Sequence, residues 1–139
     1  MTRRAGIPRS TPGRTIGRVL LAAGLVFAGV SHLFWARREF RSQVPPWVPM
    51  DADAVVVGSG VAEIGLGAAL VALPRERERI GTIVAAFFIA VFPGNLAQWA
   101  ERRSAFGLAT DRARFIRLFF QPLLVALAVW STLPADRRR

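Results

Sequence analysis

The sequence of 139 residues contains no cysteine, no lysine and no tyrosine, and it has a single histidine. Without cysteine the chain can form no disulfide, no thiolate metal site and no dithiol redox centre. One histidine is too few for a multi-histidine metal or haem site within a single chain. We therefore expect no metal site, and any redox reaction would need electrons from a partner.

All 19 basic residues are arginine, and the net charge is +10. In a soluble protein this charge would raise the question of nucleic acid. Here the arginines gather at the ends of long apolar blocks, where such residues anchor to lipid headgroups and set topology. The lipid bilayer is therefore the expected partner, and nucleic acid is not.

Hydrophobic residues make up 53% of the chain and fall in blocks about 20 residues long, enough for a helix to cross a hydrocarbon core of ~30 Å. This pattern predicts an all-α membrane protein, a four-transmembrane-helix bundle forming one domain over 15–133. Basic tails at 1–14 and 134–139 flank it, and the first is expected to be mobile on the membrane surface. The expected helices are 15–35, 54–73, 80–100 and 114–133.

An even number of crossings places both termini on one side of the membrane. That side would carry eleven arginines and the opposite side eight. The positive-inside rule then predicts a multi-pass protein of the cell membrane with both termini in the cytoplasm.

The longest predicted loop, 36–53, contains Pro45, Pro46 and Pro49, which prevent a regular helix in its second half. Trp47 lies among these prolines, so its indole is expected at headgroup depth. The segment could also fold back over the helix ends. Either Asp51 or Asp53 is expected to cap the helix that follows.

The third apolar block follows a tight charged connection, PRERER at 74–79. Pro93 within this block removes one backbone hydrogen bond and frees the carbonyl near Ile89, which predicts a kink. Asn95 follows on the next turn.

Glu63 is the only charged residue in the apolar block 54–73 and lies near its middle. A carboxylate at that depth costs roughly 2.5–3.5 kcal/mol on insertion scales, so it should face protein rather than lipid. Its helical neighbours Ser59, Gly60 and Gly67 are small, so a second helix can approach closely on this face.

Each of the other three expected helices also carries a polar side chain at a similar depth. At ~1.5 Å per residue, His32, Asn95 and Gln121 fall with Glu63 in an axial band of ~8 Å in the outer half of the bilayer. Arg117 lies one turn outward of Gln121, and its side chain could reach Glu63 as a counter-charge or extend to the surface.

Two interpretations of this polar cluster remain open. The side chains could simply bond to one another and hold the bundle together, at ~0.6 kcal/mol per bond on average. Alternatively they form a ligand-binding or proton-carrying pocket, in which a histidine beside a glutamate is a plausible relay. The candidate binding residues are His32, Trp47, Glu63, Asn95, Arg117 and Gln121; no catalytic residue is proposed.

Five segments together resemble the DoxX-like family of small four-helix integral membrane proteins, over roughly 17–133. The family's shared motif residues correspond to His32, Pro45, Pro46, Trp47, Glu63, Asn95, Arg117 and Gln121. One departure is Phe119, where relatives often carry proline. The segments are AGVSHLFWARREF (28–40), VPPWVP (44–49), SGVAEIGLGAAL (59–70), VFPGNLAQW (91–99) and RLFFQP (117–122).

The resemblance implies an accessory or quinone-associated subunit of a membrane redox system, with quinone as the cofactor and a redox protein as the partner. Two alternatives are kept: a small proton-coupled transporter, expected as a homo-oligomer because four helices make a thin wall for one pore, and a structural scaffold without a ligand. An independent enzyme is not expected.

Overall fold

The computed structural model describes residues 6–41, 44–101 and 110–135. Its helices are α1 (Pro12–Phe34), α2 (Arg37–Arg41), α3 (Ala52–Ala72), α4 (Arg77–Ala100) and α5 (Asp111–Thr132). Four of them, all except the short α2, are long and apolar enough to cross a membrane. The prediction of an all-α bundle of four transmembrane helices is confirmed.

The four long helices begin two or three residues earlier than the apolar blocks indicated. Side-chain caps explain the difference for α1, α3 and α5, because a helix starts where a polar side chain can bind its first free N–H groups. Glu76, which precedes α4, forms no such bond. Thr11 accepts a hydrogen bond from Arg14 N, and Pro12 follows at the first helical position. Asp51 is the cap of α3, accepting from Ala54 N at 3.1 Å.

The connection between α3 and α4 is shorter than predicted. Residues 77–79, which the sequence assigned to a charged loop, form the first turn of α4. Glu76 and Arg79 form an exposed ion pair at 3.1 Å across this start. The sequence placed the start of this helix too late because the charged residues 77–79 were interpreted as part of the loop.

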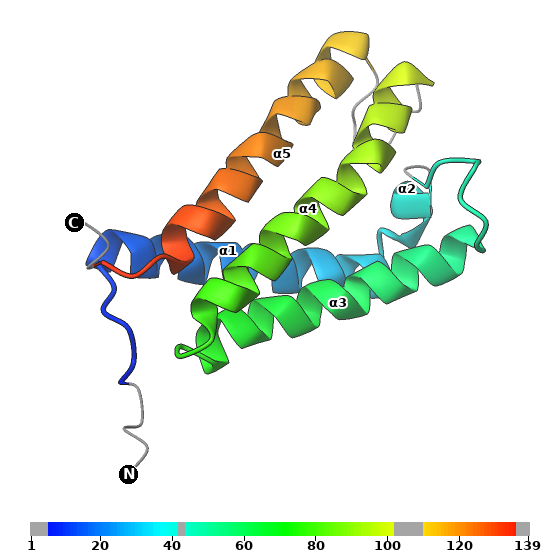
Figure 1. The fold of residues 1–139 in the computed structure, drawn as a ribbon. Coiled ribbons are helices and arrows are strands. Elements are labelled where there is room, and N and C mark those ends of the chain that lie inside the picture. The colour runs from blue at the N-terminus through cyan, green and yellow to red at the C-terminus, as the bar shows by residue number, and fades with distance from the viewer. Residues whose placement is uncertain (1–5, 42–43, 102–109, 136–139) are drawn as a thin grey trace.

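The loop between α1 and α3 contains one element that the sequence did not reveal, the short helix α2. Figure 1 shows α2 at the far end of α1, beside the start of α3. Arg37 in α2 lies 3.7 Å from Asp53 in α3, so the second candidate cap residue is engaged in an exposed ion pair instead. The three prolines follow in turns outside any helix, as expected.

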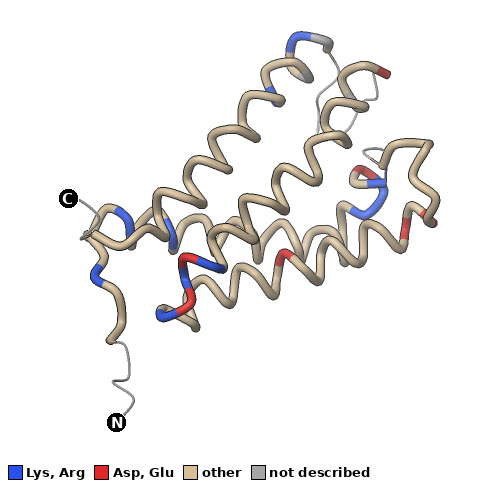
Figure 2. The backbone as a smooth tube through the Cα atoms, viewed as in Figure 1, with Lys and Arg blue, Asp and Glu red and all other residues tan. Residues whose placement is uncertain are grey.

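The long helices form two pairs, α1 with α3 and α4 with α5 (Figure 1). The pairs approach each other at the end that carries both chain termini and diverge toward the end that carries α2. Figure 2 shows charged residues concentrated at the helix ends, with an acidic position midway along α3. That position is Glu63.

Glycine allows α1 and α3 to pack with their backbones nearly in contact. A Cβ added at Gly60 would lie 2.8 Å from His32 Cβ and 2.9 Å from the Gly29 carbonyl oxygen. A Cβ at Gly67 would lie 2.8 Å from the carbonyl oxygen of Ala22. The predicted close approach beside Glu63 is confirmed, and it brings His32 to this helix.

At the converging end, arginines bind backbone carbonyl groups. Arg18 is buried and donates to the Ser131 carbonyl at 3.1 Å, and Arg14 donates to the Pro134 carbonyl at 2.9 Å. Arg77 is also buried and donates to the carbonyl of Arg9. Arg14 and Arg18 complement the partial negative charge of the free carbonyls at the C-terminal end of α5, so their bonds tie α1 to α5. The Arg77 bond ties the start of α4 to the segment before α1.

Candidate functional site

A cavity of about 730 Å³ lies between the two helix pairs. Side chains from all five helices and from the loop after α2 line it. Its volume falls within the range of small-molecule sites. All six residues that the sequence selected line this cavity: His32, Trp47, Glu63, Asn95, Arg117 and Gln121.

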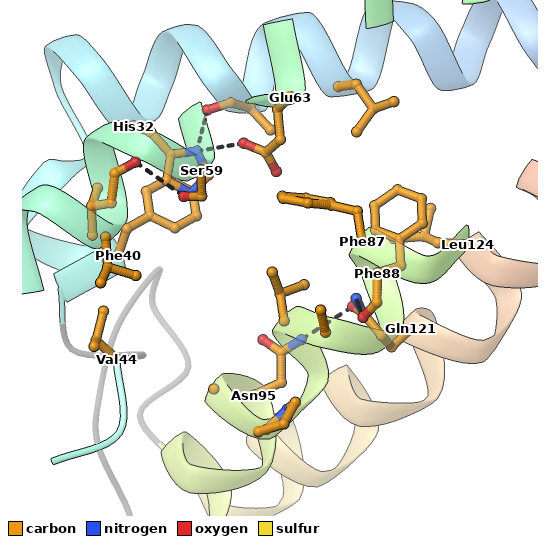
Figure 3. A pocket seen from close by; sticks show the side chains of 18 of the residues that line it. His32, Phe40, Val44, Ser59, Glu63, Phe87, Phe88, Asn95, Gln121 and Leu124 are labelled. Atoms are coloured by element: carbon orange, nitrogen blue, oxygen red, sulfur yellow. Dashed lines mark hydrogen bonds and ion pairs between the residues drawn. The ribbon is translucent and has the colours of Figure 1, made fainter. Parts of the chain in front are cut away.

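His32 and Glu63 meet on the wall formed by α1 and α3 (Figure 3). His32 Nδ1 lies 2.8 Å from Glu63 Oε2, and the two residues are only 6% and 8% exposed. Nδ1 also lies 2.7 Å from the Ala28 carbonyl oxygen one turn earlier. Because a carbonyl oxygen can only accept, Nδ1 carries a proton. The Phe40 ring from α2 stacks on the imidazole, with centroids 3.3 Å apart.

The Glu63 carboxylate is incompletely compensated. The hydrogen bond of the histidine is directed to Ala28, so Oε2 is buried beside Nδ1 without a well-aligned donor. The other oxygen, Oε1, points into the cavity (Figure 3). Since a carboxylate can accept about four hydrogen bonds, Glu63 retains unused acceptor capacity toward the cavity.

Asn95 and Gln121 form a second polar pair on the opposite wall, across α4 and α5. Asn95 Nδ2 donates to Gln121 Oε1 at 3.1 Å, and Gln121 Nε2 donates to the Phe88 carbonyl at 2.6 Å. α4 continues through Pro93. The Phe88 carbonyl that Gln121 binds is next to the Ile89 carbonyl, which Pro93 was expected to free. The oxygen of Asn95 remains on the cavity side (Figure 3).

Arg117 lines the cavity but does not act as the counter-charge of Glu63. Within the described ranges Glu63 forms its ion pair with His32, and Arg117 Nη1 is buried without a hydrogen-bond partner. The helical spacing placed Arg117 on the correct face of α5 but could not determine how far its side chain would reach. The result is an unpaired donor in the cavity wall.

Trp47 and Pro45 line the cavity from the loop, at the end where the helix pairs diverge. Pro45 is buried, whereas Trp47 is 71% exposed. The position of the indole at headgroup depth stays a prediction.

The sequence missed the apolar part of the site. Phe87, Phe88 and Leu124 line the cavity beside the polar residues (Figure 3), and Leu21 and Leu25 line it from α1. Phe40 was also missed, because it lies among arginines in a segment interpreted as loop. In an apolar helix, a residue that lines a cavity and a residue that faces lipid are both apolar, so the sequence cannot distinguish them.

A second hollow lies between α3 and α4 and has a volume of about 620 Å³. Its lining contains no polar or charged side chain, and it shares Phe87 and Ala90 with the main cavity. The aromatic ring of Phe87 therefore lies between a lipid-accessible groove and the interior. In residues 6–41, 44–101 and 110–135 no group of three His, Asp or Glu could hold a metal ion.

The fold and the cavity define a small four-helix integral membrane protein with a polar, ligand-sized site inside the bundle. A family model described as a domain of unknown function (DUF8561) matches residues 21–132, and the chain belongs to this family. The match extends from α1 to the end of α5. No curated protein and no solved structure matches the chain.

Proposed function

We propose that the protein binds a quinone-type molecule in its cavity and acts as an accessory subunit of a membrane redox system. One observation carries the proposal: the Glu63 carboxylate is buried in a cavity wall, and the ionisable side chain it contacts within the described ranges is His32. Buried ionisable groups inside membranes are costly and are usually kept for function. The resemblance to DoxX-like proteins supports the same assignment.

The distribution of polar and apolar groups suits a molecule with a polar ring and a hydrocarbon tail. Glu63 and Asn95 would offer polar atoms to a head group (Figure 3), and Arg117 also lines the cavity. Leu21, Phe87 and other apolar side chains would contact the ring faces and the first part of the tail. The groove between α3 and α4 would let a lipid-soluble ligand reach Phe87 from the bilayer.

The assignment is tested by what copurifies with the protein. The full chain is expressed in its native membrane and purified in mild detergent, and its extracted lipids are analysed by mass spectrometry. We expect near-stoichiometric quinone with the wild type and at least a fivefold loss in Glu63→Gln. The matched control Glu76→Gln removes an exposed carboxylate far from the cavity and should retain the quinone. A well-folded wild type without quinone, which also takes up none when it is added, would contradict the proposal and favour the scaffold.

A second candidate is a small proton-coupled transporter. The favouring observation is the asymmetry of the bundle, whose helix pairs diverge at one end and are joined by arginine–carbonyl bonds at the other. Such a form resembles one state of an alternating-access cycle. Glu63-dependent solute uptake into proteoliposomes driven by a proton gradient would support this candidate, and the redox assignment predicts none.

A further inference from the structure

The unsatisfied polar atoms of the cavity indicate which kind of head group it accepts. On the α3 wall, Glu63 Oε2 lies beside His32 Nδ1, and the other carboxylate oxygen, Oε1, points into the cavity, where a donor could reach it (Figure 3). On the α4 wall, Asn95 uses its amide nitrogen for Gln121 and presents its oxygen. Both groups are acceptors, so the occupant must bring donors.

Arg117 adds the complementary requirement on α5. Its side chain lines the cavity, its Nη1 has no hydrogen-bond partner among the residues that the structure describes, and a guanidinium can only donate. A head group that satisfies both the acceptor Glu63 and the donor Arg117 therefore carries at least one O–H or N–H group for Glu63 and an oxygen acceptor for Arg117. A hydroxyl group meets both needs, because it donates one hydrogen bond and accepts others.

We propose that the cavity selects a hydroxyl-bearing aromatic head group, a quinol or phenol, over the corresponding quinone, with Glu63 as the hydrogen-bond acceptor. This inference rests on the proposed function and specifies the form of its ligand. A quinone carbonyl has no proton to donate. If it faced Glu63, two acceptors, the carbonyl oxygen and the carboxylate oxygen, would lie against each other. A quinol O–H would form a charge-assisted hydrogen bond there, and such bonds are roughly twice as strong as neutral ones.

The apolar surroundings favour the same class of molecule. Phe87 and Phe88 line the cavity next to the polar atoms and suit the faces of an aromatic ring. Water alone would supply donors to Glu63, but it would leave these apolar walls without contacts.

The test uses three probes that share one short alkyl tail: a benzoquinol, the corresponding benzoquinone and the dimethyl ether of the quinol. The full chain is placed in lipid nanodiscs under argon, and affinities are measured by calorimetry. We expect the quinol to bind about tenfold tighter than the quinone and the ether, which is the effect of one hydrogen bond to a charged group. In Glu63→Gln this preference should fall to about twofold or less, because the amide can also donate to a carbonyl.

The variant Glu76→Gln is the control and should keep the wild-type preference. Thermal unfolding of Glu63→Gln, compared with the wild type, shows whether the variant is folded, and Glu63→Asp serves as a second variant that keeps the charge but withdraws it by one methylene. Equal or tighter binding of the quinone by the wild type would overturn the inference and leave the proposed function intact. Retention of the quinol preference in Glu63→Gln would also overturn it. Failure of all three probes to bind would contradict both.

Discussion

His32 on α1 and Glu63 on α3 are in direct contact where these helices pack tightly, with Nδ1 2.8 Å from Oε2. Gly29 and Gly60 make the contact possible, since a Cβ on either would collide with the opposite helix. The pair is therefore both a tie between two helices and one wall of the cavity.

Removal of His32 should destabilise the protein strongly. His32→Leu leaves the buried Glu63 carboxylate without its partner, and breaking a buried pair in this way costs about 3–5 kcal/mol. The double variant His32→Leu/Glu63→Leu should recover much of the loss, because no isolated charge remains. Thermal unfolding in detergent measures both. A double variant less stable than His32→Leu would show that the pair does not interact as described.

The Gly60→Ala substitution should weaken the α1–α3 contact. The new methyl group would meet His32 Cβ and the Gly29 backbone, and such overpacking typically costs 1–3 kcal/mol. Gly65→Ala, on the same helix, is the matched control because a Cβ there meets nothing within 4 Å. Unfolding by a graded denaturing detergent should separate the two variants, and equal stability would argue against this packing.

Replacement of Gln121 by leucine should lower stability moderately. The substitution removes the bonds to Asn95 and to the Phe88 carbonyl. Because side-chain bonds in membranes contribute about 0.6 kcal/mol on average and at most about 1.7, a total loss of about 1–2 kcal/mol is expected. A double-mutant cycle with Asn95→Leu measures the coupling, and a coupling of zero would contradict the observed bond.

The arginine–carbonyl bonds at the converging end should matter more than the exposed ion pair nearby. Arg18→Met removes a buried donor to the Ser131 carbonyl, and a loss of about 1.5–3 kcal/mol is expected for a hydrogen bond to a charged group. Arg79→Met, which removes a mostly exposed partner of Glu76, should change stability by less than ~1 kcal/mol. Comparable effects of the two variants would contradict this role of Arg18.

The absence of cysteine makes the predicted orientation directly measurable. Single cysteines at Arg9 and at Asp51 lie at opposite ends of the bundle. With both termini in the cytoplasm, a membrane-impermeant maleimide added to intact cells should label Asp51→Cys and leave Arg9→Cys unlabelled until the cells are opened. The reverse pattern would invert the orientation.

The sequence alone determined the class of fold, because membrane spans are set by local properties. About 20 apolar residues must be helical to satisfy their backbone in lipid, and the caps Thr11 and Asp51 then set where α1 and α3 begin. The depth of a polar residue is also local, since it follows from its distance along the helix to the nearest end. That is why His32, Glu63, Asn95 and Gln121 could be assigned to one layer.

Only the tertiary structure decided which of these side chains meet. Depth says nothing about which helices are neighbours, and the structure pairs His32 with Glu63 and Asn95 with Gln121 on opposite walls. Of the two positions that the sequence allowed for Arg117, contact with Glu63 or extension to the surface, the contact with Glu63 is not formed in the described part of the chain. The cavity is likewise a property of the divergence of the two helix pairs. The sequence predicted which polar residues share one depth, but the cavity between the His32–Glu63 pair and the Asn95–Gln121 pair results from helix packing.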